Sequence, residues 1–411
     1  MKALQLLTLL CLSCNLTLFA NENNSSLEKF ISSYKQLQFT YDYEKNDAQS
    51  SKLRDSWIAP LQINYNYSKS NPFNVEQTSQ SASIRINQPI FQSGGIYYGI
   101  QFANASRIYT DYSIDVAKRK MIKDTIAILM QIKQVELKEQ KQKLQIENAQ
   151  INLQQKKEEY FSGDLDSSFL DDAIIQKNSA VLALYDIQTA KEKLISSFRV
   201  LSDLDYEKVT IPHLTLLKNE EFIKHNVVLE MQKAQTKKNR YNKNVTIAKY
   251  LPKISITAGY TWKLTTNQAF QVGANIVSNS NELDYYDYGI SASIPLDINT
   301  FRDIESAKVD YLKAKVMQKD KQREMNSLYE QVIHNIKNFD KKIALSNENI
   351  ILYKKLLDDT EKLLQAGYKT EYDVQRLENS LRIQNIDTKI YEIDKQLELL
   401  NLYEMYVNAG E

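Results

Sequence analysis

The sequence predicts a mainly α-helical protein with a transmembrane β part, organised as two tandem copies of one plan. Only 9 Gly and 6 Pro occur among 411 residues, and they recur at matching places in each half. Pro89 and Gly163 stand 74 residues apart, and Pro295 and Gly367 stand 72 apart. Because self-similarity at a long period indicates repeated architecture, each copy is expected to hold two strands, a very long helix, a Gly turn and a second helix.

The N-terminus has the pattern of a secretory signal peptide over residues 1–20. A basic Lys2 precedes an apolar run over 3–19, and Ala20 comes just before a polar stretch. Both cysteines, Cys11 and Cys14, lie inside this segment, so the mature chain would form no disulfide. Lipidation of Cys14 is an alternative. The formal charge of +1 disfavours nucleic acid as a partner, and no later apolar stretch is long enough for a transmembrane helix.

The first copy is expected to span residues 21–210. Its strands are predicted at about 61–68 and 81–88, where apolar or aromatic residues alternate with polar ones, and Pro60 and Pro89 flank this region. A polar loop over Lys69–Gln80 would join the strands. Long helices are predicted at about 96–161 and 167–205, joined by the turn at Gly163.

The second copy is expected to span residues 211–411 and repeats this order. A helix over Asn219–Ala248 comes before strands at about 254–262 and 286–294, which Pro252 and Pro295 flank and a polar loop over Lys263–Asp287 joins. Two long helices follow at about 302–366 and 371–407, with the turn at Gly367 between them.

Heptad spacing in the long helices predicts coiled-coil packing. The pattern in the second copy alternates between four and three residues over Val332, Ile336, Phe339, Ile343, Ser346, Ile350, Tyr353, Leu357, Thr360 and Leu364. The returning helix continues it over Ile383, Ile386, Ile390, Ile393, Leu397 and Leu400, and carries a weaker second stripe over Leu377, Leu381, Gln384, Thr388 and Tyr391. The first copy repeats the spacing over Ile187, Ala190, Leu194, Ser197, Leu201 and Leu204. A helix with two apolar stripes has neighbours on both sides, as the wall of a helical cylinder requires.

The alternating strands fit either two hairpins on a soluble core or the wall of an outer-membrane barrel. Aromatic residues near the loop ends favour the barrel, because aromatic girdles mark membrane interfaces: Tyr65, Tyr67, Tyr260, Trp262, Tyr286 and Tyr288. Four strands cannot close a barrel, and an open edge in lipid leaves backbone groups unpaired, so the chain must oligomerise. Two chains would give eight strands and three would give twelve; the small polar inward faces favour the trimer.

These features resemble the TolC-like outer-membrane efflux protein family over essentially the whole mature chain. The family's entry into a strand is similar to Leu251-Pro252-Lys253-Ile254 and, in the first copy, to Ala59-Pro60-Leu61. Its strand-to-helix exit is similar to the segments at 87–95 and 293–297, and its helix-tip turns to those at 160–170 and 364–374. Each motif alone is weak, but six in duplicated order form a specific pattern.

The resemblance implies a homotrimeric channel, with a 12-stranded β-barrel continuous with a long periplasmic α-helical barrel. It also implies an outer-membrane location, a periplasmic adaptor protein and an inner-membrane transporter as partners, and export of drugs or proteins without a cofactor. At the periplasmic entrance it implies an aperture residue at Asp373 and a basic tip residue at Lys369. Arg376 stands where the family has a second acidic residue. Gly163 and Gly367 would mark the tips that dock the adaptor.

Solvated helix charges are an alternative reading of Asp373, Lys369 and Arg376, and Arg376 is also expected to be able to pair with Asp373. The first copy has Phe169 at the position equivalent to Asp373, so Asp171 and Asp172 are weaker candidates. Arg85 is expected to be the one charge on an inward strand face, either biasing the lumen or reaching the periplasmic interface.

Enzymatic activity and a metal site are not expected. The chain has 3 His, at positions 213, 225 and 334, and they match no metal-binding motif. The main alternative to a channel is a periplasmic coiled-coil adaptor without a pore, although an adaptor would typically carry one helical hairpin. A surface adhesin using residues 262–287 is a weaker alternative.

Overall fold

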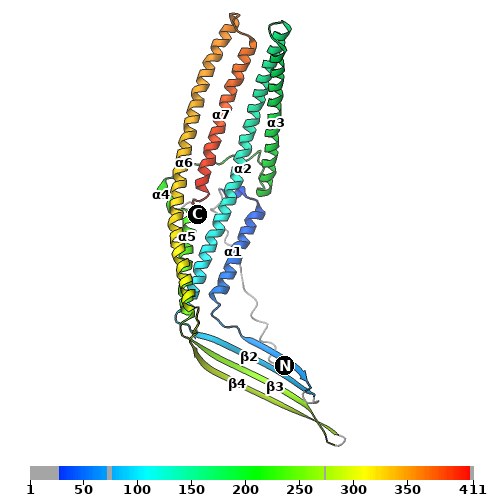
Figure 1. Cartoon of the computed structure of the whole chain (residues 1–411), viewed down its shortest axis with the longest axis vertical. Helices are drawn as coiled ribbons and strands as arrows, with labels where there is room; N and C mark the ends of the chain where they lie inside the picture. The colour runs from blue at the N-terminus through cyan, green and yellow to red at the C-terminus, as the bar shows by residue number, and fades with distance from the viewer. Residues whose placement is uncertain (1–26, 72–75, 273–274, 408–411) are drawn as a thin grey trace.

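The molecule is long, with a layer of helices at one end and a β-sheet at the other (Figure 1). The computed structural model describes residues 27–71, 76–272 and 275–407, without the side chains of 267–279. The signal peptide predicted at 1–20, with Cys11 and Cys14, lies outside the described residues. The predicted fold class, mainly helical with a small sheet, is confirmed.

The sheet has four antiparallel strands in the order β1-β2-β3-β4, which leaves β1 and β4 as its two edges. The strands are β1 (Gln62–Ser70), β2 (Gln77–Phe91), β3 (Lys253–Val272) and β4 (Asn275–Ser293). One continuous sheet therefore joins the two copies through the pairing of β2 with β3.

The strands are longer than the sequence pattern predicts. The loop expected over Lys263–Asp287 is wrong, because β3 and β4 continue through nearly all of it, and the loop expected over Lys69–Gln80 is too long, because β1 and β2 take up half of it. Polar residues follow one another at Thr265–Thr266 of β3 and Ser280–Glu282 of β4, so the apolar alternation stops there while the backbone ladder continues. Beyond the row of Gln77 and Asn267, β3 and β4 pair only with each other.

Each copy contains one long antiparallel helical hairpin. The first is α2 (Gly95–Phe161) followed by α3 (Ser167–Leu201), and the second is α6 (Thr300–Gln365) followed by α7 (Glu371–Tyr403). At 1.5 Å per residue, α2 and α6 are each about 100 Å long. They run the length of the helical layer, and α3 and α7 pack beside them in the half farther from the sheet (Figure 1).

Shorter helices fill the half of the layer nearer the sheet. There α1 (Ser33–Arg54) packs on α2, and α5 (Val227–Lys249) packs between α2 and α6. A 3-10 turn, η1 (Glu28–Phe30), precedes α1, and the short α4 (Asn219–Lys224) precedes α5. The sequence analysis did not predict α1, whose sequence is polar with no clear apolar stripe.

The main hydrophobic core lies midway along the layer, where the short segments cross the long helices. It joins Ile126 and Leu129 of α2 to Phe198 of α3, Phe222 of α4 and Leu402 of α7, all fully buried. This core holds both copies and the N-terminal helix together, so the middle of the layer is its most tightly fixed part.

Three predicted helices differ from the observed ones near this core. The helix predicted over Asn219–Ala248 is wrong, because it breaks at His225–Asn226 into α4 and α5. The Asn226 side chain caps α5 by accepting the Leu229 N–H at 3.1 Å. The helix predicted to reach 407 ends at Tyr403, because the chain then pairs with this break: Val227 N donates to Met405 O and Val407 N to His225 O.

The helix predicted over 167–205 ends at Leu201, where the backbone turns extended at Ser202. Leu201 O accepts the Ser32 N–H at 2.8 Å, and the Asp203 carboxylate accepts both the N–H and the hydroxyl of Ser33. The end of α3 therefore holds the start of α1.

The heptad pattern predicted for the second copy is confirmed by burial. Val332, Ile336, Ser346 and Thr360 are buried, and the other six predicted positions of α6 are half-buried while most of their neighbours are exposed. In the first copy the predicted stripe is partly wrong. Ala190 and Ser197 are exposed, and Ile195 and Phe198 are buried in their place.

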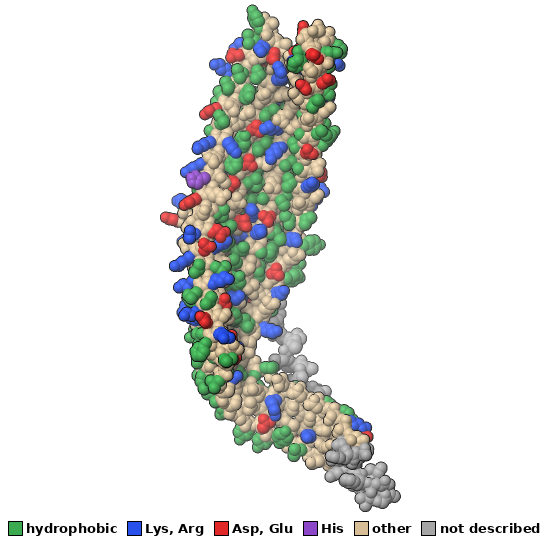
Figure 2. Space-filling view, viewed as in Figure 1, with side chains coloured by type: hydrophobic (Ala, Val, Ile, Leu, Met, Phe, Trp, Pro, Cys, Tyr) green, Lys and Arg blue, Asp and Glu red, His purple; other side chains and the backbone are tan. Residues whose placement is uncertain are grey.

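Charged side chains are spread along the helices, and hydrophobic ones gather where the sheet meets the helical layer (Figure 2). Leu296, Ile298 and Phe301 at this corner are 95%, 92% and 84% exposed. Within the described part of the chain, no helix combines the length and the hydropathy needed to cross a membrane.

Candidate functional site

The two helix tips at the far end of the molecule share one backbone design. Gly163 and Gly367 have φ of +84° and +79°, a left-handed conformation that favours glycine after a helix C-terminus. In each tip the next residue donates back to the carbonyl five residues earlier, Asp164 to Glu159 and Tyr368 to Leu363. The sequence prediction of tip turns at these glycines therefore coincides with the geometry.

The N-cap of each returning helix stands three residues after the glycine. Asp166 accepts the Ser168 N–H in the first tip. In the second tip Thr370 and Asp373 form a reciprocal capping box: Asp373 N donates to the Thr370 hydroxyl at 3.3 Å, and Thr370 N donates to the Asp373 carboxylate at 3.2 Å. Asp373 therefore fixes the start of α7.

Of the three charged residues predicted for the aperture, two pair with each other and one is exposed. Arg376 Nη2 lies 2.8 Å from Asp373 Oδ1, one helical turn away, so these two charges pair. Lys369 is exposed in the turn before the cap. The hydrogen bond from the Thr370 backbone N–H, and to a smaller extent that from Arg376, holds the pKa of Asp373 below its ordinary value. The Asp373 carboxylate therefore stays ionised at neutral pH. An aperture role for these residues stays a prediction.

A contact between the two copies lies beside this cap and was not predicted. The Tyr372 hydroxyl of α7 donates to Glu158 Oε1 of α2 at 2.7 Å, and Gln154 Nε2 donates to the same oxygen at 2.8 Å. These two donors lower the pKa of Glu158, and the bond to Glu158 raises the pKa of Tyr372. No sequence motif marks this pair, because its members are 214 residues apart and meet only through the fold.

Below this tie, α2 and α7 are joined by polar contacts at heptad spacing. Gln134 Nε2 donates to Asp394 at 2.6 Å, Lys141 Nζ lies 2.7 Å from Asp387, and Asn379 Nδ2 donates to Asn148 at 3.0 Å. The α2 members, at 134, 141 and 148, stand seven residues apart. We call these three contacts the polar ladder. Toward the tips the two copies therefore make polar contacts between α2 and α7, in addition to the apolar core that they share midway along the layer.

The prolines predicted at the strand–helix junctions lie at the corner between sheet and helices. Pro60 precedes β1 and Pro252 precedes β3, while Pro295 follows β4. Pro89 lies inside β2, where the register shifts, as is usual for proline in a sheet. The exits differ between copies: Ser93 and Gly94 have positive φ in the first, and Asp297 accepts the Asn299 N–H in the second.

Two hydrogen bonds fix this corner, one between the copies and one within the second copy. The Ser93 hydroxyl donates to Pro252 O at 2.6 Å. The Tyr250 hydroxyl at the end of α5 donates to the Asp303 carboxylate near the start of α6, which raises the pKa of Tyr250 to about 12. The corner is therefore cross-braced by side chains from both copies.

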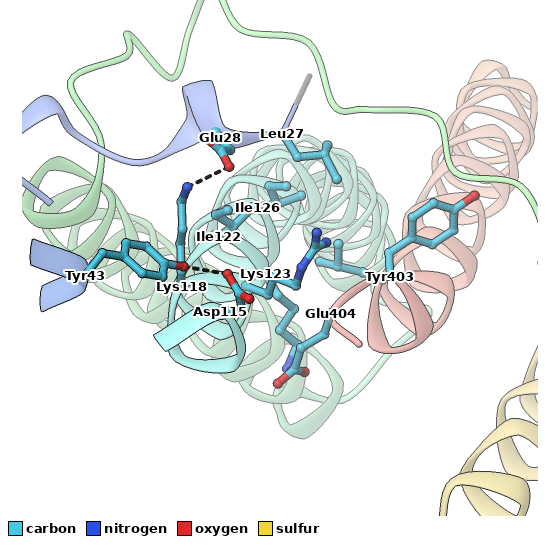
Figure 3. A pocket seen from close by; sticks show the side chains of 12 residues that line it. Leu27, Glu28, Tyr43, Asp115, Lys118, Ile122, Lys123, Ile126, Tyr403 and Glu404 are labelled. Carbon is cyan, nitrogen blue, oxygen red and sulfur yellow. Dashed lines mark hydrogen bonds and ion pairs between the residues drawn. The ribbon is translucent and has the colours of Figure 1, made fainter. Parts of the chain in front are cut away.

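A cavity of about 290 Å³ lies midway along α2, between the N-terminal turn, α1 and the end of α7 (Figure 3). Lys118 Nζ lies 2.6 Å from Glu28, and the Tyr43 hydroxyl donates to Asp115 at 2.5 Å. Burial, followed by this hydrogen bond, raises the pKa of Tyr43. Lys123 pairs with Glu404 at 3.5 Å. Because these charges pair across the cavity, they connect the chain segments around it.

No cluster of His, Cys, Asp and Glu suited to a metal ion occurs among the described residues. The chemistry at the tips and the corner consists of hydrogen bonds, ion pairs and exposed apolar side chains.

The comparisons with known proteins concern both sequence and fold. The family model described as "Outer membrane efflux protein" matches residues 220–405, which is most of the second copy. No curated protein is significantly similar to the chain in sequence.

Solved structures share the fold at low identity. The outer membrane protein VceC from Vibrio cholerae has 13% identity and a TM-score of 0.66, with 92% of this chain and 95% of that chain covered. The CmeC outer membrane channel of Campylobacter jejuni has 12% identity and a TM-score of 0.69, with 92% and 84% covered. The open MtrE outer membrane channel of Neisseria gonorrhoeae has 13% identity and a TM-score of 0.63, with 92% and 89% covered.

Proposed function

We propose, on the premise that residues 220–405 belong to the outer membrane efflux protein family and that the whole chain has the TolC-like fold, that this protein is the outer-membrane channel of an efflux or secretion system. Three chains would close a 12-stranded barrel through the outer membrane, and their helices would form a tube in the periplasm. The channel would conduct drugs or proteins passively and perform no covalent chemistry.

The observation that carries this proposal is the open four-stranded sheet. Neither edge strand, β1 or β4, has a second partner among the residues that the structure describes. Its outward residues are strongly exposed, with Ile63, Tyr288 and Ile290 at 73%, 82% and 77%. A large exposed apolar face is unfavourable in water, and open strand edges are unfavourable in lipid, where no water can hydrogen-bond the unpaired backbone groups. Closing the sheet with further copies in a membrane would pair the open edges and place the apolar face against lipid.

The proposed partners are those that the resemblance to the family implies. An inner-membrane transporter would supply the energy, and a periplasmic adaptor would connect it to the helix tips at Gly163 and Gly367. The two similar tips, each with a glycine and an N-cap at the same spacing, support a repeated docking surface around the tube end.

A membrane fractionation experiment tests the channel against the pore-less adaptor. We expect the protein in the outer-membrane fraction, resistant to salt, soluble in detergent and running as a trimer that heating dissociates. In planar bilayers the purified trimer should conduct ions. Release by salt, or a detergent-extracted protein without conductance, would instead support the adaptor.

A further inference from the structure

Three residues on neighbouring strands form one row across the polar face of the sheet. Arg85 of β2 is opposite Gly259 of β3, and Gly259 is opposite Asp287 of β4. Arg85 Nη2 lies 3.3 Å from Asp287 Oδ1, so the two side chains reach over the strand between them and pair. The expectation that Arg85 is the one charge on this face is therefore wrong.

Gly259 provides the space in which the pair forms. A Cβ atom at this position would lie 2.8 Å from Asp287 Oδ1 and 3.3 Å from Arg85 Nε. Any other residue would push the carboxylate or the guanidinium aside. A glycine within a strand often marks such a close approach.

The surroundings of the pair are uncharged. On the same face, the next rows hold Ser83, Thr261 and Tyr285 on one side and Asn87, Thr257 and Gly289 on the other. Asp287 is the one acidic residue among the described side chains of this face, whereas Lys253 and Lys263 add positive charge at other levels. Arg85 and Asp287 are 53% and 44% exposed, so both charges face the space in front of the sheet.

We infer that Arg85 and Asp287 are specificity-determining charges of the barrel lumen. Because they pair over Gly259, they keep the middle of the lumen wall electrically neutral. The inference rests on the proposed channel, in which the polar face lines the lumen. A trimer would carry three such pairs at one level. Without Asp287, three unpaired guanidinium groups at that level would favour anions.

The test measures ion selectivity of purified trimers in planar bilayers under a salt gradient. We expect Asp287→Asn to raise the anion-to-cation permeability ratio by about twofold or more, because fixed charge in a narrow lumen concentrates the opposite ion. Arg85→Gln should shift the ratio toward cations, and the double variant should return close to the wild-type ratio.

A matched control is Asp284→Asn, which removes the same charge from the same strand on the opposite face, where the Tyr260 hydroxyl donates to Asp284. It should leave the ratio unchanged. If both single variants form conducting trimers with wild-type selectivity, the inference is overturned while the channel stands. If the wild-type protein conducts no current, the proposed function fails first. If a single variant does not assemble, the double variant Arg85→Asp with Asp287→Arg, which exchanges the two charges, is measured in its place. A permeability ratio of this double variant that differs from the wild-type ratio would overturn the inference.

Discussion

At the residue scale, the second helix tip concentrates its interactions in a few side chains. Thr370 and Asp373 cap α7, Arg376 neutralises Asp373, and Tyr372 reaches Glu158 of the other copy. One turn of helix therefore both starts α7 and attaches it to α2. Changes within this turn are expected to alter the tube entrance without unfolding the body, since the main core lies far along the helices.

The Tyr372 hydroxyl is expected to restrain the second hairpin at the entrance. Tyr372→Phe removes the donor to Glu158 and keeps the ring, so the hairpins should separate more often. Single-channel recordings in planar bilayers should show a higher open probability than for wild type. Tyr368→Phe, which changes an 80% exposed tyrosine of the same tip, is the control and should behave as wild type. Equal behaviour of both variants would refute the restraint.

The Asp373 cap predicts a pH dependence with a definite sign. Because hydrogen bonding depresses its pKa in the folded tip, Asp373 stabilises the tip above the ordinary carboxyl range and stops doing so as pH falls through its lowered pKa. Hydrogen exchange of residues 370–377 should be faster in Asp373→Ala than in wild type at pH 7. The difference should shrink as the pH falls below the ordinary carboxyl range and through the lowered pKa of Asp373, and a difference independent of pH would contradict the assignment.

At the element scale, the two packing surfaces of α7 differ in chemistry. Its contact with α6 is mainly apolar, with a polar break where the Ser346 hydroxyl donates to Gln384 O at 3.2 Å. Its contact with α2 contains the polar ladder. Polar contacts hold helices in register yet separate at lower cost than an apolar seam. We therefore expect the tip half of the second hairpin, beyond the core that α2 and α7 share, to be the part that can move against α2.

The polar ladder is expected to depend on paired charges. Lys141→Met leaves Asp387, which is 15% exposed, without its cation and should weaken the contact by about 1–3 kcal/mol. A lower thermal midpoint of the detergent-solubilised trimer would show this. Lys143→Met removes a 56% exposed lysine of the same helix, and its partner Glu139 keeps Lys191 at 3.4 Å, so this control should have a smaller effect. The double variant Lys141→Met with Asp387→Leu should recover stability, and a further loss would refute the pairing.

The sequence predicts elements well where one periodic pattern extends over many residues. The ten heptad positions of α6 all lie in the packed face, because a long two-sided contact leaves a regular signal. The stripe of α3 slips at Ser197, since Phe198 turns toward the central core instead of along the hairpin. The break at Asn226 and the end of α7 could not be predicted, because each depends on the other's backbone. Asp287 was missed as a partner of Arg85 for the same reason, since it lies two strands away.

At the scale of the whole molecule, the sheet and the helical layer have surfaces of different chemistry. The helices carry mixed charges and face water, while the outward side of the sheet is apolar and the corner exposes Leu296, Ile298 and Phe301. This corner therefore marks the level where lipid should give way to the periplasm.

Opposite faces of β4 should respond differently to one added charge. Ile290→Arg places a cation on the outward face and should cost about 2–4 kcal/mol per chain if that face lies near the bilayer centre. The amount of heat-dissociable trimer in outer membranes should fall sharply. Ser291→Arg, one residue away on the polar face, should leave it nearly unchanged. The reverse order would show that the sheet faces lipid with its other side.

The unpaired edges of the sheet also govern how the protein is made. A single chain has no folded state available inside the bilayer, so the membrane part can form only when chains meet, and its rate of formation must rise with chain concentration. Until then, the edges of β1 and β4 are open to any extended strand, including one from a wrong partner. Biogenesis of this protein is therefore a competition between correct closure of the barrel and strand-mediated aggregation.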